Sequence, residues 1–276
     1  MSITNFIPTV WSENLYQALD KKYIAVANCN RDFEGDIAEQ GSVVKICGVG
    51  NISIGKYTKN ADMNDPQTLS DNVRELMIDQ AKYFNFQIDD IDRAQSTPKL
   101  MDAAMKIAAS NLANDADRYI FNLYDEINYK ITQEATVDTI LDTILKAREH
   151  LAEQNVSDFS EVVLEIAPWV ATILLKAKIA LETDNTAALQ NGYLGSIGGV
   201  PIYVSNNIAY ELADGQRHAF CYMRTKRAIA FAEQLSEVEA YRPEKRFADA
   251  VKGLHLYGAK VIYPYELIVL DLTTNM

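Results

Sequence analysis

The clearest pattern in the chain is a helical stripe of apolar residues between Thr97 and Lys130. Its members recur at steps of three and four, with charged and amide residues between them. Thr97 can cap the first turn, and Pro98 occupies the first helical position, where its missing N–H removes no hydrogen bond. The pattern predicts one long spine helix over residues 97–130. The stripe comprises Met101, Ala104, Ala108, Leu112, Tyr119, Leu123 and Ile127.

Before this helix, the chain shows the two-residue alternation and the β-branched and aromatic content of strands. Residues 42–57 and 73–88 carry this pattern, which is clearest where Phe84, Phe86 and Ile88 alternate with polar residues. Between the two stretches, residues 58–71 are polar, with Asp62, Asp65 and Asp71 against a single Lys59, which indicates an exposed tip. We therefore expect an extended β-hairpin over residues 39–88, preceded by an arm over residues 1–38 with one short helix.

This first part of the chain has no long helix of its own to cover it. An isolated hairpin is marginally stable in water, and open strand edges pair with other chains. The region must either fold back on the domain that follows or be buried on a neighbouring copy. The second alternative predicts a protein that assembles.

After the spine, helices and strands are grouped rather than alternating, so the fold class is α+β. Helices are predicted over residues 136–155 and 169–181, and a strand over 161–167 ends at Pro168. A glycine-rich turn leads into the next strand. The remaining predicted strands cover residues 200–205, 218–223, 227–232 and 236–241, and the closing stretch 251–272 is expected to break at Gly258 and Pro264.

Composition narrows the class of protein. The chain has 276 residues, of which 48% are hydrophobic and 23% charged, as in an ordinary globular protein. No run of about 20 apolar residues predicts a membrane helix, and residues 1–10 lack the order of a signal peptide, so we expect a cytosolic origin and no membrane partner. The net charge of −12 opposes tight binding to nucleic acid.

No pattern of reactive residues predicts catalysis, a cofactor or a metal. The glycines of residues 192–199 precede a strand, whereas a phosphate-binding loop precedes a helix. The three histidines lack a second ligand at metal-binding spacing. Asp89, Asp90 and Asp92 could bind a divalent cation but fit a solvated turn better. Three widely spaced cysteines favour buried reduced thiols: Cys29, Cys47 and Cys221.

One part of the chain concentrates basic residues. They could face nucleic acid, but interleaved acidic residues favour salt links between subunits or a solvated rim. The group comprises Arg224, Lys226, Arg227, Arg242, Lys245 and Arg246.

Taken in order, several stretches resemble the major capsid (coat) proteins of tailed bacteriophages, which have the Hong Kong 97-like or Johnson fold. FIPTVWSENLYQAL is similar to the amino-terminal arm of that family, and GSVVKICGVGNISIGKYTKN through DQAKYFNFQIDDIDRAQ is similar to its extended loop. The spine helix stands where the peripheral domain is expected. NGYLGSIGGVPIYVSNN, HAFCYMRTKRAIAFAEQLSEVEAYR and VKGLHLYGAKVIYPYEL resemble the axial domain and closing strands.

The resemblance implies a domain plan. Residues 1–38 would form the arm and 39–88 the extended loop. Residues 89–135 and 242–276 would form the peripheral domain, and 136–241 the axial domain. Residues expected to contact neighbouring subunits lie in the arm, the loop and the basic group: Trp11, Tyr16, Lys56, Lys59, Asp62, Asp65, Arg224, Arg227 and Arg242.

The resemblance also implies a structural function. Many copies would form hexamers and pentamers of an icosahedral shell, assembled in the host cytoplasm, that encloses double-stranded DNA without binding it sequence-specifically. A separate scaffolding protein and a portal are implied partners. No partner asparagine for a covalent link from Lys56 or Lys59 can be identified. Two alternatives stay open: an encapsulin-like nanocompartment shell, and a small-molecule enzyme whose site is assembled from scattered residues.

Overall fold

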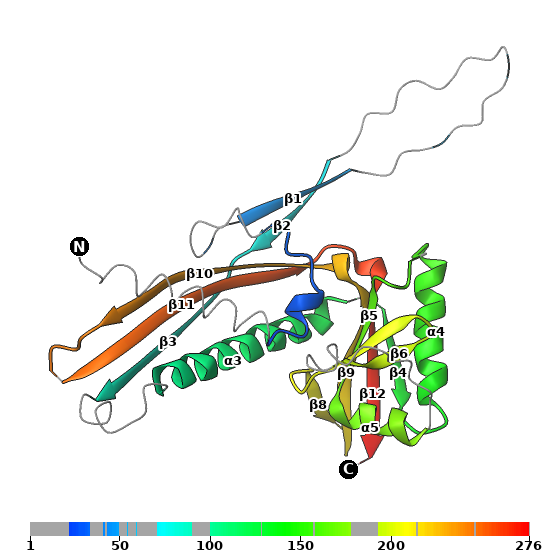
Figure 1. Ribbon diagram of the computed structural model, residues 1–276. Coiled ribbons are helices and arrows are strands. Elements are labelled where there is room, and N and C mark those ends of the chain that lie inside the picture. Colours follow the sequence, from blue (N-terminus) through cyan, green and yellow to red (C-terminus); the bar gives the residue numbers. More distant parts are fainter. Residues whose placement is uncertain are drawn as a thin grey trace.

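The computed structural model describes residues 22–33, 41, 43–49, 54, 59, 71–89, 100–127, 129–156, 158–177, 193–213, 215–245 and 247–275. Within these residues the chain forms an elongated body, a compact body and a projecting hairpin (Figure 1). The elongated body pairs a three-stranded sheet with one long helix, and the compact body is built on a seven-stranded sheet flanked by two shorter helices. This mixed architecture confirms the expected α+β class.

The long helix α3 spans Leu100–Phe121 and lies along one face of the three-stranded sheet (Figure 1). Its buried side is apolar except for Asp117, and two tyrosines connect the layers: Tyr119 donates to Asp79 at 2.9 Å, and Tyr257 donates to Asp115 at 3.0 Å. The sheet has the antiparallel order β10-β11-β3, with β10 at Ile229–Tyr241, β11 at Ala248–Val261 and β3 at Gln80–Asp89.

The predicted helix over residues 97–130 is too long. After Phe121 the backbone tightens into a 3₁₀ helix, Asn122–Glu126, and Lys130 already begins strand β4. The Tyr222 hydroxyl contacts the Ile120 and Phe121 carbonyls at 3.3 and 2.8 Å, so it satisfies carbonyl groups that a longer helix would have bonded itself. The prediction ran too far because Leu123 and Ile127 continue the apolar spacing of the helix. Both are buried, although neither lies in the α-helix.

The compact body holds the mixed sheet β4-β12-β9-β5-β7-β6, with β8 pairing along part of β9. Helix α4 (Ile140–Glu153) buries an apolar side against this sheet, and α5 (Pro168–Lys176) begins at Pro168. The strands are β4 (Lys130–Glu134), β5 (Val162–Ile166), β6 (Tyr193–Ile197), β7 (Val200–Val204), β8 (Tyr210–Ala213), β9 (Gln216–Thr225) and β12 (Leu267–Asn275).

Several local predictions can be compared with the structure. The β6–β7 turn uses Gly198 and Gly199, both with positive φ, as a two-residue hairpin turn requires. The break expected at Pro264 is confirmed, because a short 3₁₀ turn, Pro264–Glu266, separates β11 from β12. The break expected at Gly258 is wrong, because β11 runs through it. Residues 227–232 and 236–241 contribute to one strand, β10, with a register shift between Leu235 and Glu237.

Strand pairing does not follow the expected domain boundaries. A division between residues 241 and 242 would separate β10 from β11, which pair over most of their length. Strands β4 and β12, both placed in the peripheral domain by the sequence, lie in the sheet of the compact body beside β9. The expected boundaries differ from the strand pairing because the chain passes between the two bodies several times. Only the pairing partners of the strands reveal these crossings.

The hairpin is shorter than predicted, and its return strand differs. Strand β1 (Val43–Val49) pairs with β2 (Asp71–Met77), whereas β3 turns away to pair with β11. Thus the alternation over residues 73–88 belongs to two strands in different sheets. Residues 80–89 are covered by their own chain, which is the first of the two alternatives that the sequence left open.

Candidate assembly surfaces

The described part of the amino-terminal region, residues 22–33, is held against the body by buried polar groups; we call it the docked segment. Asp117 of α3 accepts backbone hydrogen bonds from Ile24, Ala25 and Val26 at 3.0–3.1 Å. These N–H groups lie at the start of a short 3₁₀ helix, where no helical partner exists. Burial raises the pKa of Asp117 to about 7, and the backbone donors oppose this shift.

A second carboxylate holds the same segment through an arginine. Arg224 of β9 forms two hydrogen bonds of 3.0 Å with Glu165 of β5, and both side chains are fully buried. The guanidinium also donates to the backbone carbonyls of Ala25, at 3.0 Å, and Asn28, at 2.7 Å. Arg224 was expected to contact a neighbouring subunit. That prediction is wrong, because the side chain is enclosed within its own chain.

A third carboxylate completes the attachment. Glu233 of β10 accepts hydrogen bonds from Tyr23 and Arg31 at 2.5 and 2.6 Å, and its Oε2 lies 2.8 Å from His255 Nε2. Burial, reinforced by Glu233, raises the pKa of Tyr23, so its hydroxyl stays a donor. The docked segment is therefore fixed to α3, β9 and β10, and through Arg224 to β5, and this is where the amino-terminal region joins the body.

Sequence reasoning missed these three acidic residues. A signal was present, since Glu165 interrupts the apolar run EVVLEIA and Asp117 falls beside buried positions of α3. A buried carboxylate needs donors, so each residue could have been marked as requiring a partner. The identity of the partner could not be inferred, because the backbone donors of residues 24–26 lie more than 90 residues away from Asp117 in the sequence.

The remaining predicted contact residues fall into two groups. Lys59, Arg227 and Arg242 are exposed, and Arg227 forms an ion pair with Glu266 while lying 5.4 Å from the Tyr263 ring centre. Thus the basic residues do not form one patch, since Arg224 is buried and Arg242 follows the far end of β10 (Figure 1). The others lie outside the described residues: Trp11, Tyr16, Lys56, Asp62 and Asp65.

The hairpin presents one buried and one open face. Val44, Ile46 and Leu76 pack against the body on the inner side. On the outer side, Val43 lies opposite Met77, and these side chains are 42% and 56% exposed. Val73, at 45%, lies on the same face, beyond the exposed Lys45–Glu75 pair that separates it from Val43 and Met77.

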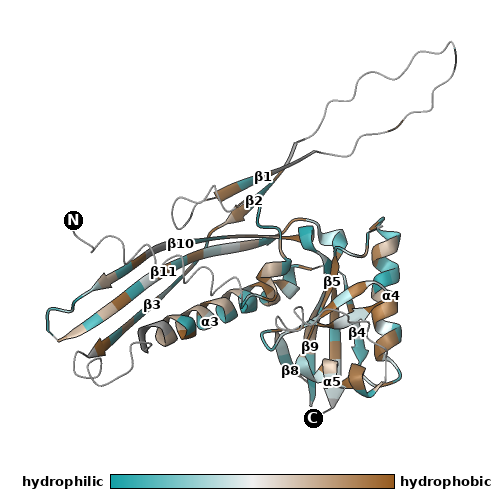
Figure 2. Ribbon diagram, viewed as in Figure 1, coloured by the Kyte–Doolittle hydropathy of each residue, from teal (hydrophilic) through white to brown (hydrophobic). Residues whose placement is uncertain are grey.

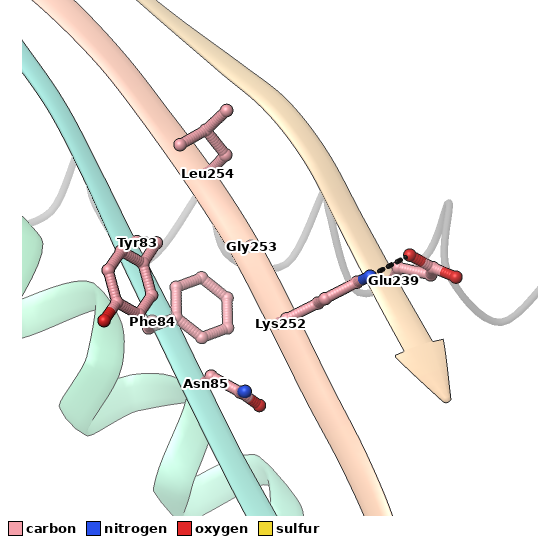
Figure 3. A pocket seen from close by; sticks show the side chains of 7 residues that line it. All are labelled: Tyr83, Phe84, Asn85, Glu239, Lys252, Gly253 and Leu254. Atoms are coloured by element: carbon pink, nitrogen blue, oxygen red, sulfur yellow. Dashed lines mark ion pairs between the residues drawn. The ribbon is translucent and has the colours of Figure 1, made fainter. Parts of the chain in front are cut away.

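A second open surface lies on the three-stranded sheet, on the side away from α3. Tyr83 of β3 pairs with Leu254 of β11, and Tyr83 is 79% exposed. These residues line a shallow hollow with Asn85, Lys252 and Glu239, as Figure 3 shows. The two charged groups form an ion pair at 2.8 Å, so the hollow is apolar with a neutralised edge. Figure 2 shows apolar and polar residues alternating along β11.

The reactive side chains of the described residues have structural neighbours. His150 stacks on Tyr129 with ring centres 3.7 Å apart, and His218 lies 2.9 Å from Asp271. Burial raises the pKa of Cys29 to about 11 and that of Cys221 to about 12, so both thiols stay protonated. Within the described ranges, no three His, Cys, Asp or Glu side chains gather as metal ligands would. None of the described helices is long and apolar enough to span a membrane.

Comparisons with known proteins place this architecture. No family profile and no curated protein matches the chain. Among solved structures, one from Mycobacterium phage Che8 aligns with 28% identity and a TM-score of 0.70, over 90% of this chain and 91% of that one. The capsid of cyanophage P-SCSP1u aligns with 14% identity and a TM-score of 0.67, over 90% and 86% of the two chains. The fold is the Hong Kong 97-like capsid fold.

Other matches agree with this fold. The capsid of Ralstonia phage GP4 has a TM-score of 0.67 at 14% identity, over 91% of this chain and 89% of that one. A virus-like particle from Pyrococcus furiosus matches at 0.57 and 12% identity, over 98% of this chain and the whole of that one. These three matched structures are two phage capsids and a virus-like particle.

Proposed function

We propose that this chain is the major capsid protein of a tailed phage and that it assembles as hexamers and pentamers of an icosahedral shell. The fold supports a shell-forming capsid protein. The observation that carries the finer proposal is the hairpin, whose outer face exposes three large apolar side chains in the isolated chain. A second copy lying on this face would bury Val43, Val73 and Met77, and permanent interfaces typically bury about 2,000–5,000 Å².

The same proposal assigns roles to the two bodies. The elongated body, with α3 and the sheet β10-β11-β3, would be the peripheral domain. The compact body would be the axial domain, which surrounds the symmetry axis of a hexamer or pentamer. Exposed Lys59, Arg227 and Arg242 are proposed contacts to neighbouring subunits, together with Trp11, Tyr16, Lys56, Asp62 and Asp65.

Double-stranded DNA is the proposed cargo, with a separate scaffolding protein and a portal as partners and the virion as location. The net charge of −12 suits a shell that encloses DNA without gripping it, since charge-based binding requires many cationic contacts. Assembly would take place in the host cytoplasm.

A nanocompartment shell is the second candidate, and the Pyrococcus virus-like particle is the observation that favours it. Both candidates require self-assembly, so the first test is sedimentation velocity of the purified chain. Fast-sedimenting capsomers or shells are expected, and a strictly monomeric protein under assembly conditions would contradict both. Particles that carry a host protein rather than phage DNA when isolated from infected cells would favour the nanocompartment.

A further inference from the structure

Strand β2 approaches β11 unusually closely at Gly258. A Cβ atom added at this position would lie 2.2 Å from the Met77 carbonyl oxygen, 3.0 Å from its carbonyl carbon and 3.1 Å from Ile78 Cα. All three are backbone atoms, so no rotamer change can relieve the contact. The strands would have to separate by about 1 Å to restore an ordinary distance.

Glycine is required at this position because a Cβ atom has no room, and not because of the backbone conformation, since Gly258 is not among the glycines with positive φ. Ala232 lies directly opposite Gly258 on β10, and Ala230 is two residues away on the same strand. Small residues of the body thus face large residues of the hairpin. We call this contact the hairpin base cluster: Val44, Ile46, Leu76, Ile78, Ala230, Ala232, Leu256 and Ile262.

The hairpin has a further attachment to the body near the same point, because Arg74 donates to the Val261 carbonyl at 3.1 Å. The Gly41 N–H donates to the Ile78 carbonyl at 2.9 Å and closes the base of the hairpin itself. Each strand of the ladder spans seven residues, about 23 Å at the usual rise. A shift of about 1 Å at the base therefore becomes a displacement of several ångströms at the outer end if the hairpin tilts as a unit.

We propose that Gly258 sets the angle at which the β1–β2 hairpin leaves the body, and that this angle decides whether neighbouring subunits can meet. The inference rests on the proposed function. Gly258 contacts no partner in this account; it is a positioning residue that acts through the backbone of β2. A side chain at this position leaves both bodies folded and misdirects the hairpin.

The test compares Gly258→Ala with Leu256→Ala. Leu256 lies two residues away on the same strand face and belongs to the hairpin base cluster, but its truncation removes packing without intruding on β2. Spin labels on Val73→Cys and Leu175→Cys, both exposed, report the position of the hairpin in unassembled subunits with a Cys47→Ser background. Particles are scored separately in unlabelled protein with Val73 intact, because Val73 belongs to the proposed interface. Gly258→Ala should shift the distance between labels by a few ångströms and abolish regular particles. Leu256→Ala should lower the unfolding midpoint, leave the mean distance unchanged and still yield regular particles.

Unchanged particles from folded Gly258→Ala protein would overturn the proposal, as would an unchanged distance between labels. If this variant does not fold, Ala232→Val offers a second test, because it places a larger side chain in the hairpin base cluster. The same shift in distance and the same loss of particles are expected. Normal particles from Ala232→Val would then count against the proposal. A wild-type protein that never assembles refutes the proposed function instead, while the distance between labels still tests the angle.

Discussion

Individual buried charges decide how the amino-terminal region is attached. Asp117, Glu165 and Glu233 each lie within an otherwise apolar environment, and each is matched by donors from the docked segment or from Arg224. Burying a charge is costly unless it is paired and hydrogen-bonded. Because the donors include backbone groups at fixed positions, these contacts specify one placement of the segment, which apolar packing alone would specify less sharply.

Replacing Arg224 by Met should destabilise the protein strongly. The substitution leaves Glu165 buried without its partner, which costs about 3–5 kcal/mol in comparable sites. The matched control is Arg227→Met, which removes an exposed ion pair worth about 0–1 kcal/mol. Denaturant unfolding of the unassembled subunit measures both. Equal small losses in the two variants would mean that the buried pair does not hold the docked segment.

Asp117 should make stability depend on pH in a defined direction. Its pKa in the folded protein, about 7, lies above that of an aspartate in an unfolded chain, so folding favours the protonated form. The contribution is greatest below about pH 4 and is lost as the pH rises to about 7. The variant Asp117→Asn serves as the reference, because its amide side chain does not titrate. The free energy of unfolding of the wild type minus that of Asp117→Asn should therefore fall between about pH 4.5 and pH 7.5, and a constant difference would contradict the assignment.

At the scale of elements, patterns of apolar residues predicted most helices and strands but not their partners. Helix α4 and strand β5 lie where the sequence placed them, because the apolar residues that formed each pattern are buried in the structure. The return strand of the hairpin could not be predicted, since residues 73–77 and 80–88 alternate alike yet pair with β1 and β11. Gly258 was misread as a break for a related reason: a close approach between strands leaves no periodic signal.

Shortening the hairpin should separate folding from assembly. Val49 and Asp71 lie opposite each other at the end of the ladder, so an Asn-Gly turn replacing residues 50–70 can close it without changing the register. The shortened protein should keep the unfolding midpoint of the wild-type subunit, because the hairpin base cluster is untouched. Sedimentation velocity should show no closed particles, and normal particles from this variant would show that the loop is not needed between subunits.

At the scale of the whole molecule, part of the first third of the chain leaves apolar side chains exposed. The alternative that the first third is buried on a neighbouring copy is wrong for the docked segment and β3, which pack within their own chain. It remains a proposal for the outer face of the hairpin. The fold itself was predictable from the order of the elements, whereas the assignment of strands to the two bodies was not, because each body is built from separated stretches of sequence.

Electron cryo-microscopy of particles assembled from the purified chain tests the central claim most directly. We expect closed icosahedral shells in which a second copy covers Val43, Val73 and Met77 on the hairpin of the first. A shell in which these side chains stay exposed to solvent, or a protein that forms no shell at all, would contradict the account.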